Sequence, residues 1–199
     1  MNKDFVIKHD FTEYKKVFLE QNSKLNLMSK NDEQFLYEKH IYDSLAIKLS
    51  NRLKDGMTLL DIGCGGGFPS VPIAIEYPNV NVTCLDSIRK KINAINQIKE
   101  TLKLKNLTTI CDRAENIKDK KFDIITVRAV AKLAKITEYA LPLLKKDGVF
   151  ICYKSKKAIE ELEEAKTVLL KNKAKVLEII EYTLPLEDIY QRSLILIGF

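Results

Sequence analysis

The chain has 199 residues, and its 46% hydrophobic content is enough for one folded domain with a modest extension. No segment approaches the roughly 18 uninterrupted apolar residues of a membrane span, and the charged start at 1–4 has no apolar signal core, so we expect a cytoplasmic protein without a membrane partner. The net charge of +6 and a pI near 9.0 mildly favour a polyanionic partner, although a lysine-rich composition alone produces the same balance.

The 4 cysteines are widely spaced without a C-x-x-C pair, and there are only 2 histidines. We therefore expect neither a disulfide framework nor a metal site. Cys64 lies in a glycine-rich segment, where we expect it to line a ligand rather than to act as a nucleophile.

The first 52 residues repeat apolar side chains at helical spacing, which predicts a helical extension over 1–52. From residue 53 onward, short apolar runs alternate with helical patterns, as in a parallel sheet with right-handed crossovers. The predicted strands span 58–62, 80–85, 107–111, 122–127 and 148–153, and the predicted helices span about 69–77, 88–103, 131–145 and 155–171.

A glycine-rich turn follows the first predicted strand, with Gly63, Gly65 and Gly67 between Asp61 and Phe68. Glycines let a turn take unusual dihedrals and let a ligand lie directly on the backbone. An ordinary strand-to-helix turn is the alternative, but it needs only one glycine. We therefore predict a cofactor loop at the carboxyl edge of the sheet.

The second strand ends at Asp86, about twenty residues beyond the loop, where a carboxylate binds the ribose diol of nucleotide cofactors. The alternative is an acid that stabilises the next helix N-terminus. The G-x-G-x-G spacing differs from the dinucleotide pattern, and Asp61 would repel a pyrophosphate but suit an ammonium and a sulfonium. We therefore expect S-adenosylmethionine and no metal, with a nicotinamide-dependent oxidoreductase as the alternative.

The fourth strand indicates which acceptor is methylated. It lacks the proline and aromatic residues that adenine or cytosine amino methylation uses, and no cysteine stands where carbon-5 methylation needs a thiolate. Acceptors with their own lone pair remain, such as guanine N7. Arg128, at the end of this strand, could bind the N7/O6 edge or the cofactor; the alternative is that it pairs with a structural acid. Basic groups around 89–91 and 154–157 fall at the same sheet edge and favour RNA.

The chain ends differently, with apolar strands at Ala174–Thr183 and Ser193–Phe199 and no room for a helix between them. An antiparallel hairpin must therefore close the sheet. The predicted fold is α/β, of the class I S-adenosylmethionine-dependent methyltransferase type: a Rossmann-like, mostly parallel seven-stranded sheet over 53–199 with a C-terminal antiparallel hairpin.

Specific motifs run through most of the sequence. They are Asn26–Ser29, His40–Leu45, Asp61–Pro69, Leu85–Ser87, Arg113–Glu115 and Val127–Ala129. With them the chain resembles the glucose-inhibited division protein B family, the bacterial small-subunit ribosomal RNA guanine-N7 methyltransferases. The sequence differs from the family pattern at three positions. Ser70 stands where the family usually has glycine, and Met28 where it usually has threonine. After the fifth strand the family generally has Lys-Gly, whereas this chain has Lys154-Ser155.

The resemblance implies a role for each matching residue. Arg128 would be catalytic and would lie between the cofactor and the incoming base. The implied cofactor-binding residues are Gly63, Gly65, Phe68, Asp86, Ala114, Glu115 and Arg128. The implied RNA-contacting residues are His40, Asp43, Arg89 and Lys154. His40 and Asp43 share a helix face, so they could instead brace the extension against the sheet.

The resemblance also implies the reaction: methyl transfer from S-adenosylmethionine, leaving S-adenosylhomocysteine, to N7 of guanine 527 in the 530 loop of 16S ribosomal RNA. The partner would be 16S rRNA or the small ribosomal subunit, and the protein would act as a monomer. A class I fold that binds RNA and assists ribosome assembly without catalysis is the alternative.

Overall fold

A single seven-stranded sheet organises the computed structural model, which describes residues 5–118, 120–155, 158–186 and 190–199. The strands are β1 (Thr58–Ile62), β2 (Asn81–Asp86), β3 (Leu107–Cys111), β4 (Phe122–Arg128), β5 (Leu144–Lys154), β6 (Lys175–Thr183) and β7 (Gln191–Gly198). Their order is β3-β2-β1-β4-β5-β7-β6. The first five strands pair in parallel, and β7 pairs antiparallel with both β5 and β6. The predicted fold class is therefore confirmed.

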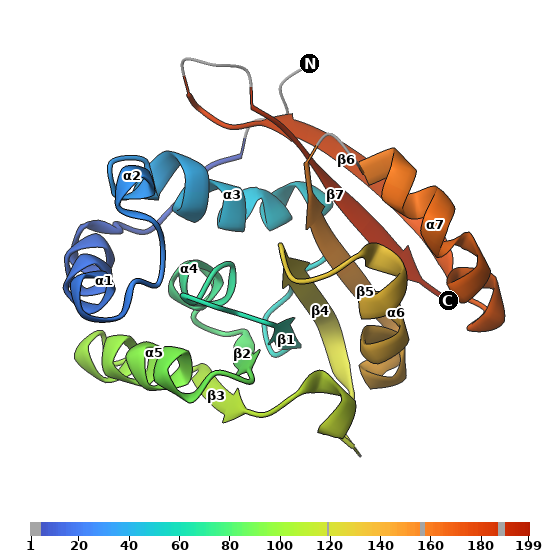
Figure 1. Ribbon diagram of the computed structural model, residues 1–199, viewed down its shortest axis with the longest axis horizontal. Helices are drawn as coiled ribbons and strands as arrows, with labels where there is room; N and C mark the ends of the chain where they lie inside the picture. The colour runs from blue at the N-terminus through green and yellow to red at the C-terminus, as the bar shows by residue number, and fades with distance from the viewer. Residues whose placement is uncertain (1–4, 119, 156–157, 187–189) are drawn as a thin grey trace.

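Helices cover both faces of this sheet (Figure 1). The long helices are α1 (Thr12–Leu25), α4 (Ser70–Glu76), α5 (Arg89–Thr101), α6 (Leu133–Ala140) and α7 (Ala158–Lys171). The shorter turns are α2 (Lys30–Glu33), the π-helix η1 (Leu36–Ile41), α3 (Tyr42–Leu45) and the 3-10 turns η2 (Ala46–Ser50), η3 (Ala114–Asn116) and η4 (Leu141–Leu143). One hydrophobic cluster joins α1, α3, α4 and α5 to the sheet, and a second lies under α6 and α7. The two clusters make a three-layer core.

The predicted boundaries are wrong between β4 and β5. The helix expected over 131–145 ends at Ala140, because Pro142 has no amide hydrogen to continue it, and η4 follows. Strand β5 begins at Leu144 rather than at 148, and Leu144 pairs with Phe122 beyond an irregularity in the ladder. The apolar side chains keep helical spacing beyond Ala140, so this spacing alone placed the end of the helix too late.

The N-terminal segment packs directly on the glycine loop. The ring of Phe18 in α1 lies 5.0 Å from that of Phe68, and a Cβ added at Gly66 would lie 3.3 Å from the Cβ of Leu27. The buried carboxylate of Glu76 in α4 accepts hydrogen bonds from the backbone amides of Lys8 and His9. The extension and the sheet thus share one hydrophobic cluster. In the described part of the chain, no helix is both long and apolar enough to cross a bilayer.

Candidate active site

The loop after β1 has the backbone of a ligand cradle. Gly63, Gly65 and Gly67 have φ values of +69°, +57° and +93°, which favour glycine. The amides of Gly63 and Cys64 both donate to the carbonyl of Leu85, at 2.7 and 3.0 Å, and so fix the loop to the end of β2. The segment therefore turns sharply at the carboxyl edge of the sheet, where open α/β sheets bind ligands.

Cys64 does not take the place expected for it. Its side chain is buried beneath the loop, and it is not among the residues that line the adjacent cavity. The neighbouring Cys84 thiol and burial together raise the pKa of the Cys64 thiol well above its usual value. A neutral, buried thiol is a packing residue and a poor nucleophile.

Asp86 connects the loop to the next helix. One carboxylate oxygen accepts a hydrogen bond of 2.9 Å from the amide of Gly65, and the other accepts one of 2.9 Å from Ile88, which precedes α5. Asp86 can therefore both stabilise the start of α5 and bind a ribose, because each carboxylate oxygen has a second lone pair for a ligand. This geometry is compatible with both hypotheses made from the sequence.

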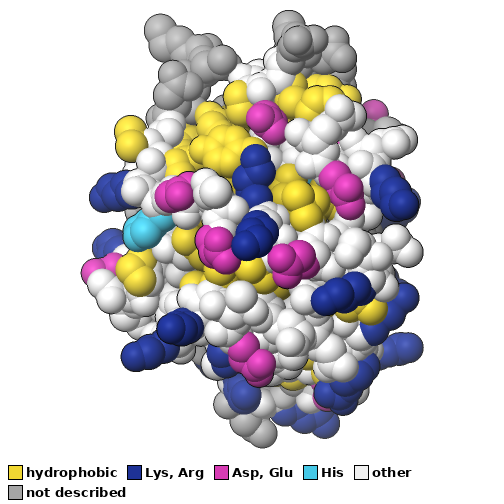
Figure 2. Space-filling model, turned by 90° about the vertical axis from the view of Figure 1, so that its left-hand side faces the viewer, with side chains coloured by type: hydrophobic (Ala, Val, Ile, Leu, Met, Phe, Trp, Pro, Cys, Tyr) yellow, Lys and Arg dark blue, Asp and Glu magenta, His cyan; other side chains and the backbone are white. Residues whose placement is uncertain are grey.

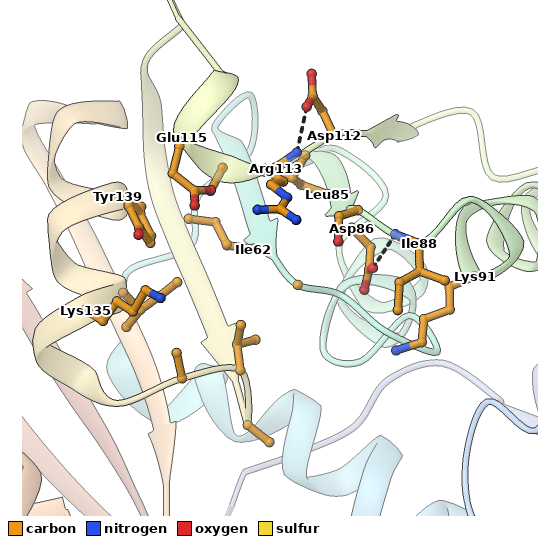
Figure 3. Close-up of a pocket in the computed structure, with 17 residues that line it drawn as sticks. Ile62, Leu85, Asp86, Ile88, Lys91, Asp112, Arg113, Glu115, Lys135 and Tyr139 are labelled. Carbon is orange, nitrogen blue, oxygen red and sulfur yellow. Dashed lines mark hydrogen bonds between the residues drawn. The ribbon is translucent and has the colours of Figure 1, made fainter.

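A cavity of about 440 Å³ opens between the carboxyl ends of β1, β2, β3 and β4 (Figure 3). Four of the expected cofactor residues line it: Gly63, Asp86, Ala114 and Glu115. Its volume is within the range of small-molecule sites, and Gly63, the one glycine among the described residues that line it, adds no side chain to its wall. The expected residues Gly65, Phe68 and Arg128 are not among the lining residues.

Several polar residues of the cavity were missed from the sequence. Asp112, Lys135 and Tyr139 line it without having been singled out; Lys91 and Arg113 also line it, although the sequence indicated them only as part of a basic group and of a family motif. Figure 3 shows Asp86 and Lys91 on the side opposite Lys135 and Tyr139. Lys135 and Tyr139 are four residues apart on α6, so they share a helix face. That spacing was the only available signal, since neither residue belongs to a local motif.

Val130 narrows the cavity at the loop. A Cβ added at Gly63 would lie 2.5 Å from Val130 Cγ2, so the loop after β4 rests on the first glycine. Ala129 enters this loop with a φ of +54°. The contact makes Gly63 a position where close approach, as well as dihedral freedom, requires glycine.

Arg128 is held beside the cavity by a polar cluster. Its Nη1 donates to Asp43 Oδ2 at 3.0 Å, and its Nη2 lies 3.0 Å from His40 Nδ1. The guanidinium stacks over the ring of Phe68, 5.1 Å from the centroid. The pairing with an acid, which was the alternative weighed for Arg128, is therefore present.

Asp43 is the centre of this cluster and is only 1% exposed. Besides Arg128, it accepts hydrogen bonds from Arg192 Nε and Nη2 at 3.1 and 3.0 Å and from the Tyr182 hydroxyl at 2.6 Å. Burial opposes its ionisation, but Arg192 and Arg128 outweigh burial and hold the pKa of Asp43 below its usual value. A carboxylate so enclosed orients arginines and has no free surface for RNA.

His40 is neutral in this environment, because burial and the Arg128 charge lower its pKa to about 4. Its Nδ1 therefore accepts a hydrogen bond from Arg128, and Nε2 carries the proton. Like Asp43, His40 connects the helical extension to the sheet through Arg128. This bracing role was the alternative to RNA contact in the sequence analysis.

The role expected of Asp61 does not fit its position. Its carboxylate is fully buried, where it accepts from the Ser70 amide at 3.3 Å and from the Thr126 hydroxyl at 3.0 Å. It does not line the cavity, so it does not face a cationic ligand there. Burial raises the pKa of Asp61 to about 7. The Ser70 hydroxyl is buried beside this carboxylate, and it opposes the rise in the pKa of Asp61 together with the Thr126 hydroxyl.

The expected RNA contacts differ in accessibility. Arg89 is exposed at the start of α5. Lys154 is not, because its side chain is 10% exposed and its Nζ donates to Glu161 Oε2 at 2.6 Å, which ties β5 to α7. Lys156 and Lys157 lie outside the described residues. The described residues contain no cluster of histidine, cysteine and carboxylate side chains able to hold a metal ion.

Comparison with solved structures agrees with the fold. The M. jannaschii protein TYW2, solved in complex with AdoMet, superposes with a TM-score of 0.61 at 16% identity, covering 78% of this chain and 76% of that one. A precorrin-6y C5,15-methyltransferase from Geobacter metallireducens superposes with a TM-score of 0.55 at 17% identity, covering 88% and 91%. The sheet order, the closing hairpin and the glycine loop thus define a class I methyltransferase fold.

Sequence comparison defines the family. A family model described as rRNA small subunit methyltransferase G (GidB) matches residues 7–193. Proteins named ribosomal RNA small subunit methyltransferase G are similar: that of Staphylococcus saprophyticus is 44% identical over 191 residues, covering 94% of this chain and 80% of the relative. That of Lachnoclostridium phytofermentans is 42% identical over 192 residues, covering 94% and 79%. The chain belongs to the rRNA small subunit methyltransferase G family.

Proposed function

We propose that this protein transfers a methyl group from S-adenosylmethionine to N7 of guanine 527 in the 530 loop of 16S ribosomal RNA. The observation that carries the proposal is the family match over residues 7–193, together with the cavity beside Gly63 at the carboxyl edge of the sheet. The substrate is 16S rRNA or the small ribosomal subunit, the protein acts as a monomer, and it works in the cytoplasm where ribosomes are made.

In this proposal the cavity binds the cofactor. Asp86 accepts hydrogen bonds from the ribose hydroxyls, Ala114 and Glu115 border the adenine, and the Gly63 backbone borders the methionine part. When bound, the cofactor supplies a methyl group already activated by its sulfonium. The protein then has mainly to align the acceptor with that methyl group.

Arg128 is proposed to position the acceptor. Its guanidinium is at the end of β4, next to the Ala129–Ala131 wall of the cavity, and it can donate to guanine O6 while the N7 lone pair stays free. No proton leaves N7 in this reaction, so no general base is required. The neutral His40, whose Nδ1 is engaged by Arg128, agrees with a site that orients rather than deprotonates.

Transfer of tritiated methyl from S-adenosylmethionine to 16S rRNA and to 30S particles that lack the modification tests the proposal. Nuclease digestion and mass spectrometry then locate the label. Label in 7-methylguanosine from the 530 loop is the expected result. Cofactor binding without transfer to either substrate would overturn it and favour an RNA-binding assembly factor.

A further inference from the structure

A second cavity, separate from the one that contains the glycine loop, lies between the helical extension and the β6–β7 hairpin. It has a volume of about 530 Å³. Its lining residues are Gln34, Phe35, Glu38, Lys39, Pro185, Leu186 and Tyr190. Figure 2 shows hydrophobic side chains gathered at the top of the face that contains α1 and α2, with Lys and Arg side chains beside them. Neither the family match nor the predicted site accounts for this cavity.

Two aromatic rings and one ammonium group define its chemistry. Lys39 Nζ lies 4.7 Å from the ring centroid of Phe35 and 5.4 Å from that of Tyr190. The same Nζ donates to Asp32 Oδ1 at 3.1 Å. Tyr190 is 43% exposed, so part of its surface is open to a ligand.

Hydrogen bonds hold the backbone from which both rings project. Phe35 precedes the π-helix η1, its amide donates to the carbonyl of Asp32 at 2.9 Å, and its carbonyl accepts from Lys39 at 2.8 Å. The carbonyl of Tyr190 accepts from the amide of Leu184 at 3.1 Å, which holds the Tyr190 backbone beside the end of β6. Pre-positioned rings bind a flat ligand with little loss of conformational entropy.

The lining favours an aromatic heterocycle over a phosphate. Asp32 and Glu38 carry two negative charges next to the single ammonium of Lys39, which disfavours a phosphate group. Gln34 and Glu38 offer amide and carboxylate groups for the edge of a base, and the rings offer faces on which a base stacks. This chemistry matches one unpaired nucleobase.

We propose that this cavity binds an unpaired base of the RNA substrate, next to the nucleotide that enters the methylation site. Lys39 directly precedes His40, and Tyr190 is two residues before Arg192, so the cavity adjoins the cluster that holds Arg128. The inference rests on the proposed function, because it takes the ligand to be RNA. A base held here fixes the register in which the strand crosses the sheet edge.

The chain contains no tryptophan, which gives a direct measurement. A Tyr190→Trp variant has one indole in the cavity, and stacking on a base quenches its fluorescence. A Leu170→Trp variant places the same reporter at an exposed position of α7 and is the control. We expect 16S rRNA and unmodified 30S particles to quench Tyr190→Trp and to leave Leu170→Trp unchanged.

Alanine variants measure the contribution to binding. We expect Phe35→Ala and Tyr190→Ala to bind RNA about 5- to 150-fold more weakly in filter-binding assays at fixed salt, the effect of one lost base stack. Tyr190→Phe keeps the ring and Leu170→Ala lies elsewhere, so both should bind as the wild type does. Cofactor affinity should be unchanged in all four.

Each other outcome has a distinct meaning. Wild-type affinity in both alanine variants would overturn the base site while leaving the proposed function intact. A loss confined to 30S particles without quenching would also overturn it and identify a surface for a ribosomal protein. RNA binding and quenching without methyl transfer by the wild type would refute the proposed function alone, and a wild type that binds no rRNA would refute both.

Discussion

Arg128 of β4 and Asp43 of α3 lie 85 residues apart in the sequence, and their side chains are joined by a hydrogen bond of 3.0 Å. Arg192, from β7, binds the same carboxylate. Two guanidinium groups thus share one buried negative charge, so this cluster carries a net positive charge. Such a charge suits a polyanionic substrate.

Arg128→Ala should lower the rate of methyl transfer about 100- to 1000-fold, the range for loss of one aligned donor. The fold should persist, because Asp43 keeps its bonds to Arg192 and Tyr182. Single-turnover methyl transfer gives the rate, and circular dichroism monitors the fold. An unchanged rate would contradict the role of Arg128; Arg52→Ala, at the opposite edge of the sheet, is the control.

Asp43→Ala should destabilise the protein by about 3–5 kcal/mol, since it leaves two partly buried guanidinium groups without their counter-charge. Urea unfolding measures the change, with exposed Asp147→Ala as the control. A loss below about 1 kcal/mol would show that water or another group replaces the carboxylate. The pKa of Asp43 is lowered, so this stabilisation should be present above about pH 4 and be lost as the pH falls through its folded pKa.

Asp86→Ala should weaken S-adenosylmethionine binding by about 1–3 kcal/mol, as expected for a lost hydrogen bond to a charged group. The Gly65 amide also loses its acceptor in this variant, so the cradle itself loosens. Isothermal calorimetry measures the affinity, and Asp55→Ala, whose carboxylate binds Asn79, is the matched control. Equal affinities in the two variants would reject a cofactor role for Asp86.

Gly63→Ala and Gly56→Ala form a matched pair. Both glycines have positive φ, +69° and +83°, so each alanine should cost about 1 kcal/mol of stability. Only at Gly63 does the new Cβ meet Val130, whereas nothing lies within 4 Å at Gly56. We expect cofactor affinity to fall in Gly63→Ala alone, measured by calorimetry. Similar affinities would mean that the loop after β4 moves aside freely.

Asp61 should make stability depend on pH. Its folded pKa of about 7 lies above the usual value of about 3.9, so the protonated form is favoured on folding. Its contribution is full below about pH 4 and is lost as the pH rises to about 7. Asp61→Asn keeps an oxygen that accepts from the Ser70 amide, and its amide nitrogen replaces the oxygen that accepts from Thr126, so the Thr126 hydroxyl must turn and accept instead. The wild-type unfolding free energy, relative to this variant, should fall across that window; a pH-independent difference would exclude the titration.

Local patterns predicted the fold well. The glycines after β1, Asp86 at the end of β2 and the apolar terminal hairpin each depend on neighbouring residues, so the sequence displays them directly. The predicted end of α6 was wrong, because the spacing of apolar residues does not show that Pro142 stops the helix early.

The site was predicted only in part, because its contacts join distant segments. The partners of Asp43 lie 85 and 149 residues away, and no spacing rule reports such distances. Lys154 and Asp61 have suitable charges, yet one pairs with Glu161 and the other is buried under α4. Residue type indicated possible chemistry, and packing decided which groups reach the cavity.

The strand order has a consequence for synthesis. Strand β7 lies between β5 and β6, although it follows both in the chain. A growing polypeptide that ends before residue 191 therefore has a gap in its ladder and cannot supply Arg192 to Asp43. The arginine cluster can form only after β7 has left the ribosome's exit tunnel, so a nascent chain would hold an incomplete site until then.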